Sequence, residues 1–352
     1  MNKTLLSVAI AALSVSSTAI ASEIAVTEDN FIVAESSMYF EKNSKENAVP
    51  VNELSHQRTM ANVDTQDIIR MNQDAAYSIA VIDVSEGATI TLPETDLYMT
   101  ALFIDLNHLN PAVIYAGESI TLNPGDLTIG EHVYMLVRTG QRTFDAQGQA
   151  EMNQLQDSVV INANSANEFV GKKYNQQQLE SVRNGLIPQV SELANHAPTT
   201  WFGKTWDDVN KRAHLLAGAA GWAGLPTQHA IYSPGFMTGQ GLEGCSTVTI
   251  DTPPLDYDKA GFFSVTTYDN LGWIAQDNFA LNNHQMEQNK DGTWTFNFSQ
   301  DGACEAIEAN MKNVMTVQED WIAQFRMYVP IDELETLTYL KQVMATPITP
   351  VK

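Results

Sequence analysis

The sequence predicts an α+β multidomain protein with two jelly-roll-like antiparallel β-sandwiches and a helical layer between them. Short β-rich runs, separated by glycine and proline, fill residues 79–138 and are typical of antiparallel sandwiches and jelly rolls. Patterns typical of helices follow between residues 175 and 220. Strand-like runs then return after Cys245, which indicates a second β-rich domain.

The first 21 residues have the pattern of a signal peptide. Lys3 supplies a positive charge, and residues 5–15 are mostly apolar but too few to cross a bilayer. Ala19-Ile20-Ala21 has the small-residue pattern of a cleavage site. We therefore expect cleavage near Ala21 and export to the periplasm or beyond it. A buried N-terminal helix is the alternative.

Residues 22–170 are predicted to combine N-terminal helices with the first sandwich. Asp29-Asn30 could cap a helix that carries Phe31 and Phe40 on its apolar side. The β-rich runs that follow are residues 79–84, 88–92, 98–105, 112–115, 118–122 and 132–138.

Residues 171–244 are predicted to form a helical connecting region. Asn175 could open a helix that Pro188 ends or kinks. A second helix is predicted to begin at Trp206, because Thr205 is a suitable cap and apolar residues recur on one face after it.

Residues 245–352 are predicted to form the second sandwich and a C-terminal helix. Asp332 is a suitable cap for that helix. The predicted strands are residues 247–250, 261–268, 293–298 and 321–328.

The chain is strongly acidic. Its 352 residues include 19 basic and 42 acidic side chains, which gives a net charge of −23. Such a surface repels nucleic acids and anionic lipids, so we expect neither as a partner. No apolar run after the leader reaches the ~18 residues of a membrane span, so no span is expected.

The chain has two cysteines, Cys245 and Cys304. Export would place them in an oxidising compartment, where cysteine pairs tend to form disulfides. A disulfide between them is one possibility, and two separate buried thiols are the other.

The usual catalytic and cofactor-binding motifs are absent from the sequence. It has no His-Glu-x-x-His pair, no Gly-x-Ser-x-Gly turn, no phosphate-binding loop and no Cys-x-x-Cys. The seven histidines are widely dispersed, and no spacing suggests a metal site. We therefore predict neither a metal nor a cofactor.

The candidate site lies at the ends of strands in the first sandwich. Residues 70–78 form a dense polar stretch before a hydrophobic strand, a place where β-scaffolds often carry function. Other polar residues follow two later strands. The residues predicted to take part in catalysis are Asp74, Asp105, His108 and Arg138. The residues predicted to bind the ligand are Asn72, Gln73, Tyr77 and Asn107.

If these strand ends meet, they supply the groups needed for acid–base chemistry. Asp74 or Asp105 would act as the base, His108 as its acid–base partner, and Arg138 would stabilise negative charge. The alternative is structural, because Asp and Asn at strand ends commonly form turns. In that case His108 would hydrogen-bond a loop and Arg138 would pair with a structural carboxylate.

Tryptophans offer a weaker indication of a ligand site. Trp201 and Trp273 are predicted in loops, where an indole could stack on a sugar or another ring. Trp206, Trp294 and Trp321 are predicted to be buried in the core.

Several stretches of the sequence match known motifs in the same order. Residues 70–81 look like an Asn-Arg-Asp-Thr-x-Tyr-Ser segment, and residues 89–108 look like a Pro-ending strand followed by Tyr and Asp-x-Asp/Asn-His. Residues 262–272 and 325–330 look like Phe-Trp-Ser-x-x-x-Tyr-Asp-x-x-Gly and Leu-Arg-Leu-Tyr-x-Pro. The chain therefore resembles bacterial exported proteins that combine domains of unknown function of types 1254 and 1214.

This resemblance implies two jelly-roll-like sandwiches with helices packed between them, and no established activity. The chain departs from the family pattern at two positions. Gln73 stands where the family usually has Arg, and Ala75 stands where it usually has Thr. The loss of an Arg at position 73 weakens an anion-binding role for that residue.

Two functions are compatible with the sequence. One is an exported soluble protein with a small-molecule or glycan site at the first sandwich and hydrolase- or lyase-type activity. The other is a non-catalytic periplasmic binding or envelope-interaction protein. Gln73 in place of Arg slightly favours the second.

Overall fold

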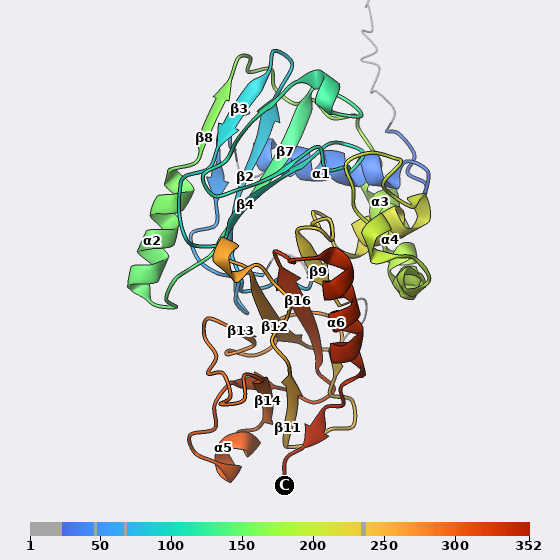
Figure 1. Cartoon of the computed structure of the whole chain (residues 1–352). Coiled ribbons are helices and arrows are strands. Elements are labelled where there is room, and N and C mark those ends of the chain that lie inside the picture. Colours follow the sequence, from blue (N-terminus) through green and yellow to red (C-terminus); the bar gives the residue numbers. More distant parts are fainter. Residues whose placement is uncertain (1–22, 46–47, 67–68, 234–236) are drawn as a thin grey trace, which may run out of the picture.

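The structure is a computed structural model that describes residues 23–45, 48–66, 69–233 and 237–352. The predicted signal peptide, residues 1–21, lies outside the described residues. Figure 1 shows two β-rich parts, one above the other, with helices packed beside them. We call the upper one the first β part and the lower one, coloured orange and red, the second β part. The fold is mixed, and most of its strand pairs are antiparallel.

The first β part contains a larger sheet of five strands and a smaller sheet of three. The larger sheet, in spatial order, consists of β1 (Ser55–His56), β2 (Ala76–Asp83), β7 (His132–Thr139), β4 (Met99–Ile104) and β5 (Val113–Tyr115). The smaller sheet consists of β6 (Ser119–Leu122), β3 (Ala88–Thr91) and β8 (Val160–Ala163). The six runs predicted between residues 79 and 138 are thus confirmed as strands β2 to β7.

Alternate residues of β2 and β7 point to opposite faces of the larger sheet, as strand geometry requires. Ile82 and Val137 belong to the core that this sheet shares with the smaller one. Tyr77 and Leu136 belong instead to an apolar cluster on the other face, with residues such as Leu225. That second face looks toward the helices and the second β part.

Three helices form a layer at one side of the molecule: α1 (Phe31–Lys45), α3 (Gln176–Leu186) and α4 (Lys211–Ala220). Their apolar faces meet in one buried cluster. The helix predicted after Asn175 is confirmed, since the Asn175 side chain accepts a hydrogen bond from the Gln178 amide. A 3-10 helix, Ile187–Asn195, continues from α3. The helix predicted after Asp29-Asn30 is confirmed as α1.

The predicted start of α4 at Trp206 is wrong. Asp208 accepts hydrogen bonds from both the amide and the hydroxyl of Thr205, which closes a separate turn. Asn210 then caps the helix by accepting hydrogen bonds from the amides of Arg212 and Ala213. Trp206 is consequently 40% exposed and not buried in the core.

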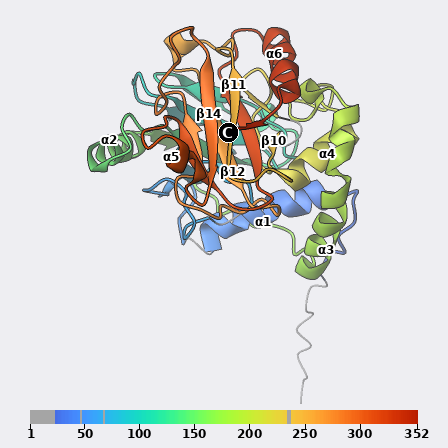
Figure 2. The same ribbon diagram turned by 90° about the horizontal axis from the view of Figure 1, so that it is seen from below.

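A helix and a strand were not predicted in the polar stretch after residue 139. They are α2 (Ala146–Asp157), which Asp145 caps, and β8. Figure 2 shows α2 on the opposite side of the molecule from α3 and α4.

The second β part also contains two sheets around one core. One consists of β10 (Met237–Thr238), β16 (Ile322–Tyr328), β12 (Phe262–Tyr268) and β13 (Ala280–Asn282), with β9 (Ala230–Tyr232) also paired to β16. The other consists of β15 (Val314–Val317), β14 (Trp294–Gln300), β11 (Cys245–Ile250) and β17 (Thr349–Pro350). The helix predicted after Asp332 is confirmed as α6 (Glu333–Ala345).

Two details of the second β part differ from the expected pattern. The pair β14–β15 is parallel, so the expectation of purely antiparallel sheets is wrong here. The segment predicted to be helical, residues 171–244, ends in β9 and β10, which pair with β16. The connecting region therefore supplies strands to the second β part.

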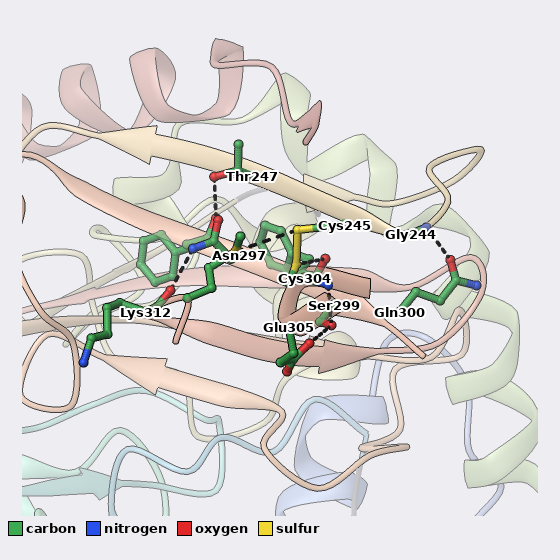
Figure 3. Close-up of a disulfide and its surroundings, with 12 residues drawn as sticks. Gly244, Cys245, Thr247, Asn297, Ser299, Gln300, Cys304, Glu305 and Lys312 are labelled. Atoms are coloured by element: carbon green, nitrogen blue, oxygen red, sulfur yellow. Dashed lines mark hydrogen bonds between the residues drawn. A yellow bond between two sulfur atoms is a disulfide. The ribbon is translucent and has the colours of Figure 1, made fainter. Parts of the chain in front are cut away.

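A disulfide joins Cys245 to Cys304, with a sulfur–sulfur distance of 2.13 Å. Figure 3 shows that it links the start of β11 to the short helix α5 (Ala303–Ile307). The Ser299 hydroxyl accepts a hydrogen bond from the Cys304 amide and donates one to Glu305. Both cysteines are buried. No helix in the described ranges is long and apolar enough to cross a membrane.

Candidate functional site

A cavity of about 500 Å³ lies where the first β part, the helical layer and the second β part meet. We call it the central cavity. One wall is the face of the larger sheet that looks toward the helices and the second β part. Tyr77 and Ile79 of β2 and Leu136 and Arg138 of β7 line the cavity from this face. These residues lie two apart on their strands, so strand alternation brings them to one face.

The other walls come from the helical layer and the second β part. The apolar residues Val190, Leu193 and Phe202 line the cavity on the helical side. Gln324 and Arg326 of β16 line it from the second β part. Their alternating neighbours on β16, such as Phe325, point instead into the core of that part.

The cavity lining is basic, although the chain as a whole is acidic. Lys42, Arg70, Arg138 and Arg326 line it, and none of its described lining residues is Asp or Glu. The whole chain carries a net charge of −23. Local positive charge in an otherwise acidic protein favours anions at this one place.

Arg138 is buried with few hydrogen-bond partners. Its Nη2 donates to the Ala223 carbonyl at 2.7 Å, whereas its Nη1 has no partner. The guanidinium also lies 5.9 Å from the centre of the Tyr77 ring. A guanidinium stays charged at any ordinary pH, so a positive charge is buried here.

Arg326 is buried with many partners. Its Nη1 donates to the Thr266 hydroxyl, and its Nη2 donates to the Arg70 carbonyl and the Tyr268 hydroxyl. This arginine therefore joins the second β part to the polar stretch before β2. The sequence contained a signal for it, since Arg326 sits among apolar residues on a strand and must face the other way.

Asp74 lies at the contact between the two β parts and not in the lining of the central cavity. Its carboxylate accepts hydrogen bonds from the Ser264 hydroxyl at 2.8 Å and the Tyr328 hydroxyl at 3.0 Å. Burial raises the pKa of Asp74 above its ordinary value, while Arg326 and the two hydroxyls act in the opposite direction.

Asp105 and Asn107 form a turn after β4 and lie outside the described cavity lining. Asp105 accepts hydrogen bonds from the amides of Asn107, Leu109 and Thr128 and from the Thr128 hydroxyl. The Asn107 side chain donates to the same hydroxyl at 2.9 Å. Burial raises the pKa of Asp105, and these hydrogen bonds oppose that shift.

His108 is fully buried beside His214 and Trp222. Burial, with a smaller contribution from His214, lowers the pKa of His108 well below its usual value. The ring is therefore neutral near pH 7, and its Nε2 accepts a hydrogen bond from the Ala223 amide at 2.9 Å. Ala223 is therefore bonded at both backbone groups: its amide donates to His108, and its carbonyl accepts from Arg138.

The remaining predicted residues divide into two groups. Asn72 and Tyr77 line the cavity, and the Asn72 amide donates to the Tyr77 hydroxyl at 3.1 Å. Gln73 lies outside the described lining and donates to the Ala61 carbonyl. Of the two loop tryptophans, Trp201 lines the cavity, whereas Trp273 is 38% exposed on the surface.

No group of three or more His, Cys, Asp or Glu residues in the described part of the chain is arranged to hold a metal ion.

The comparisons with known proteins support one of the two expected domain types. Residues 51–129 match the model of a family described as a protein of unknown function (DUF1254). This range includes Asn72, Asp74, Tyr77 and the turn at Asp105. No curated protein matches the chain.

The solved structures that are similar to this chain include the following two. The VPA0106 protein from Vibrio parahaemolyticus has 16% identity and a TM-score of 0.66, over 92% of this chain and 98% of that one. An uncharacterized protein from Burkholderia cenocepacia has 12% identity and a TM-score of 0.46, over 86% of this chain and 84% of that one. The first likeness shows a shared fold.

Proposed function

We propose that this chain is an exported protein that binds a small organic molecule in the central cavity without converting it. The observation that carries the proposal is the cavity itself, with a volume of about 500 Å³ and walls from all three parts of the chain. Ligand sites are typically concave, mostly apolar and about 300–1,000 Å³ in volume, with a few placed polar groups. The central cavity has these properties.

Binding has more support than hydrolase or lyase chemistry. Both carboxylates proposed as bases, Asp74 and Asp105, lie outside the described cavity lining and accept hydrogen bonds from their own surroundings. His108 accepts a hydrogen bond from a backbone amide through its Nε2. None of these three groups is presented to a ligand in the cavity as a base.

We further propose that each β part is a jelly-roll-like sandwich and that the second is of the 1214 type. The support is that two sheets share one core in each part. The proposed boundaries are a signal peptide to residue 21, then residues 22–170, 171–244 and 245–352. Export is proposed from the leader pattern alone, and the N-terminal sequence of chain recovered from the periplasm should begin near Ser22.

The binding proposal can be tested by filling the cavity. Gly221 lines it, and a Cβ placed there would meet no atom within 4 Å. Gly221→Phe adds an aromatic ring at this position of the lining and should abolish binding of the neutral fluorescent probe N-phenyl-1-naphthylamine. Gly185→Phe is the matched control, because Gly185 also has open space around it but lies on the exposed side of α3.

Probe binding by the native chain and by Gly185→Phe, but not by Gly221→Phe, would support the proposal. Equal binding by all three chains, or no binding by any, would mean that the central cavity is not a binding site for small organic molecules. A thermal-shift screen of small organic molecules would then identify ligands, because a ligand raises the unfolding temperature by binding the folded chain.

A further inference from the structure

We propose that the ligand of the central cavity carries a carboxylate on an apolar or aromatic body, and that the Arg138 guanidinium binds this carboxylate. The inference rests on the proposed function, since it concerns the same cavity. It goes further by naming the chemical class of the ligand and the residue that selects it.

The first argument is the missing counterion of Arg138. The residue is 7% exposed and lines the cavity. Among the described residues it donates to the Ala223 carbonyl, and its Nη1, itself a buried atom, has no acceptor there. A buried charge without a partner costs several kcal/mol. A carboxylate in the cavity would supply a counterion to the guanidinium.

The neighbours of Arg138 do not replace a counterion. The groups near its guanidinium are the neutral phenols of Tyr77, Tyr98, Tyr232 and Tyr328. The Tyr77 ring contributes a cation–π contact at 5.9 Å, which is weak beside a charge-assisted hydrogen bond. The positive charge of Arg138 therefore remains available to a ligand.

Two other arginines, the half-buried Arg183 and the buried Arg326, show how an arginine is satisfied in this chain. Arg183 donates two hydrogen bonds to Glu35 and forms an ion pair with it at 2.6 Å. Arg326 donates to four oxygen acceptors. Burial acts to lower its pKa, but the Tyr268 and Tyr328 hydroxyls and the Asp74 carboxylate raise it. Arg138 differs from both, which singles it out for a ligand.

A second donor in the same lining lacks a partner. Trp201 is 8% exposed, and its indole Nε1 has no acceptor. Both this group and Arg138 Nη1 can only donate. Neither atom is itself exposed to the cavity, but both residues line it beside other donors and no described acid, so a carboxylate complements this lining.

The remaining lining suits an apolar body. Val190, Leu193, Phe202 and Trp222 supply aliphatic and aromatic surface on the helical side. Burying such a body contributes about 25 cal/mol for each Å² removed from water. The carboxylate would fix orientation and class, and the apolar body would add affinity.

The test compares ligands of equal shape and different charge. 4-Phenylbutyrate and 4-phenylbutyramide compete with N-phenyl-1-naphthylamine near pH 7, where the acid is ionised. We expect the acid to bind the native chain at least about tenfold more tightly than the amide. Arg138→Met should remove that preference, so that the acid and the amide bind this variant alike, and Arg138→Lys should retain part of it.

Lys312→Met is the matched control for charge alone. Lys312 is exposed and pairs with Glu287 on the surface of the second β part, so its loss should leave the acid preference intact. If the acid and the amide bind the native chain equally, the inference is overturned while the proposed function stands. If neither they nor the probe bind, the proposed function itself fails. The native comparison needs no variant, so it holds even if Arg138→Met does not fold.

Discussion

Asp74→Ala should destabilise the whole chain, because Asp74 fastens the first β part to the second. The carboxylate accepts hydrogen bonds from Ser264 of β12 and Tyr328 of β16. Each hydrogen bond to a charged group contributes about 1.5–3 kcal/mol, so the loss of both should cost about 3–6 kcal/mol in free energy of unfolding. The change also leaves two hydroxyls buried without this acceptor.

Urea unfolding near pH 7 measures this cost. Asp277→Ala is the control, because Asp277 is an exposed acid of the same second β part and its loss should change the free energy by less than about 0.5 kcal/mol. Asp74→Asn keeps an acceptor of the same shape, so it should lie between the native chain and Asp74→Ala.

The pH dependence of the same variants has a definite sign. Burial raises the pKa of Asp74 in the folded chain above its value in the unfolded chain, which is about 3.9. Between those two values the folded chain keeps a proton that the unfolded chain has lost, so stability falls as pH rises through this window. The native chain should therefore lose stability relative to Asp74→Asn, which cannot titrate, as pH rises above about 4.

The opposite pattern would refute this reasoning. If Asp74→Ala unfolds at the same urea concentration as the native chain but no longer processes or binds its ligand, Asp74 is a functional group. A native chain that gains stability relative to Asp74→Asn as pH rises would mean that Arg326 outweighs burial and lowers the pKa.

Three further changes test other contacts. Cys304→Ala should lower the free energy of unfolding by about 2–5 kcal/mol, and a reductant should lower the melting temperature of the native chain but not of the variant. Arg183→Met leaves the buried carboxylate of Glu35 without its partner and should cost about 3–5 kcal/mol, most of which Glu35→Met should restore in the double variant. Gly239→Ala places a methyl group against the Trp321 indole and should cost about 1–3 kcal/mol in thermal unfolding; an unchanged melting temperature would mean that the indole moves freely.

The strands of the first β part could be predicted because their signals are local. Apolar runs bounded by Gly and Pro predicted β2 to β7, and the capping residues Asn175 and Asp332 predicted the starts of α3 and α6. The start of α4 could not be predicted in the same way. Thr205 and Asn210 are both suitable caps, and only the tertiary structure shows that Asp208 closes a turn between them.

The candidate site was harder to predict from the sequence, because the roles of its residues depend on distant parts of the chain. Asn72, Tyr77 and Arg138 line the cavity, as residues that enter or end strands of one sheet can. Asp74 has the same kind of sequence context, yet its partners lie 190 and 254 residues away. No local pattern distinguishes a carboxylate that meets a ligand from one that meets Ser264 and Tyr328.

Two of the arginines that line the cavity, Arg326 and Arg138, differ in how far the chain itself satisfies their charge. Arg326 donates its hydrogen bonds to groups of the chain itself, including the Arg70 carbonyl of the first β part. The loss of Arg326 should therefore weaken the contact between the β parts. Arg138 lies on the facing sheet and keeps Nη1 without an acceptor. A charge that the fold does not satisfy contributes little to cohesion, because its burial costs more than one backbone hydrogen bond returns. The proposed ligand would offset this charge, so we expect carboxylate binding in the cavity to depend on Arg138.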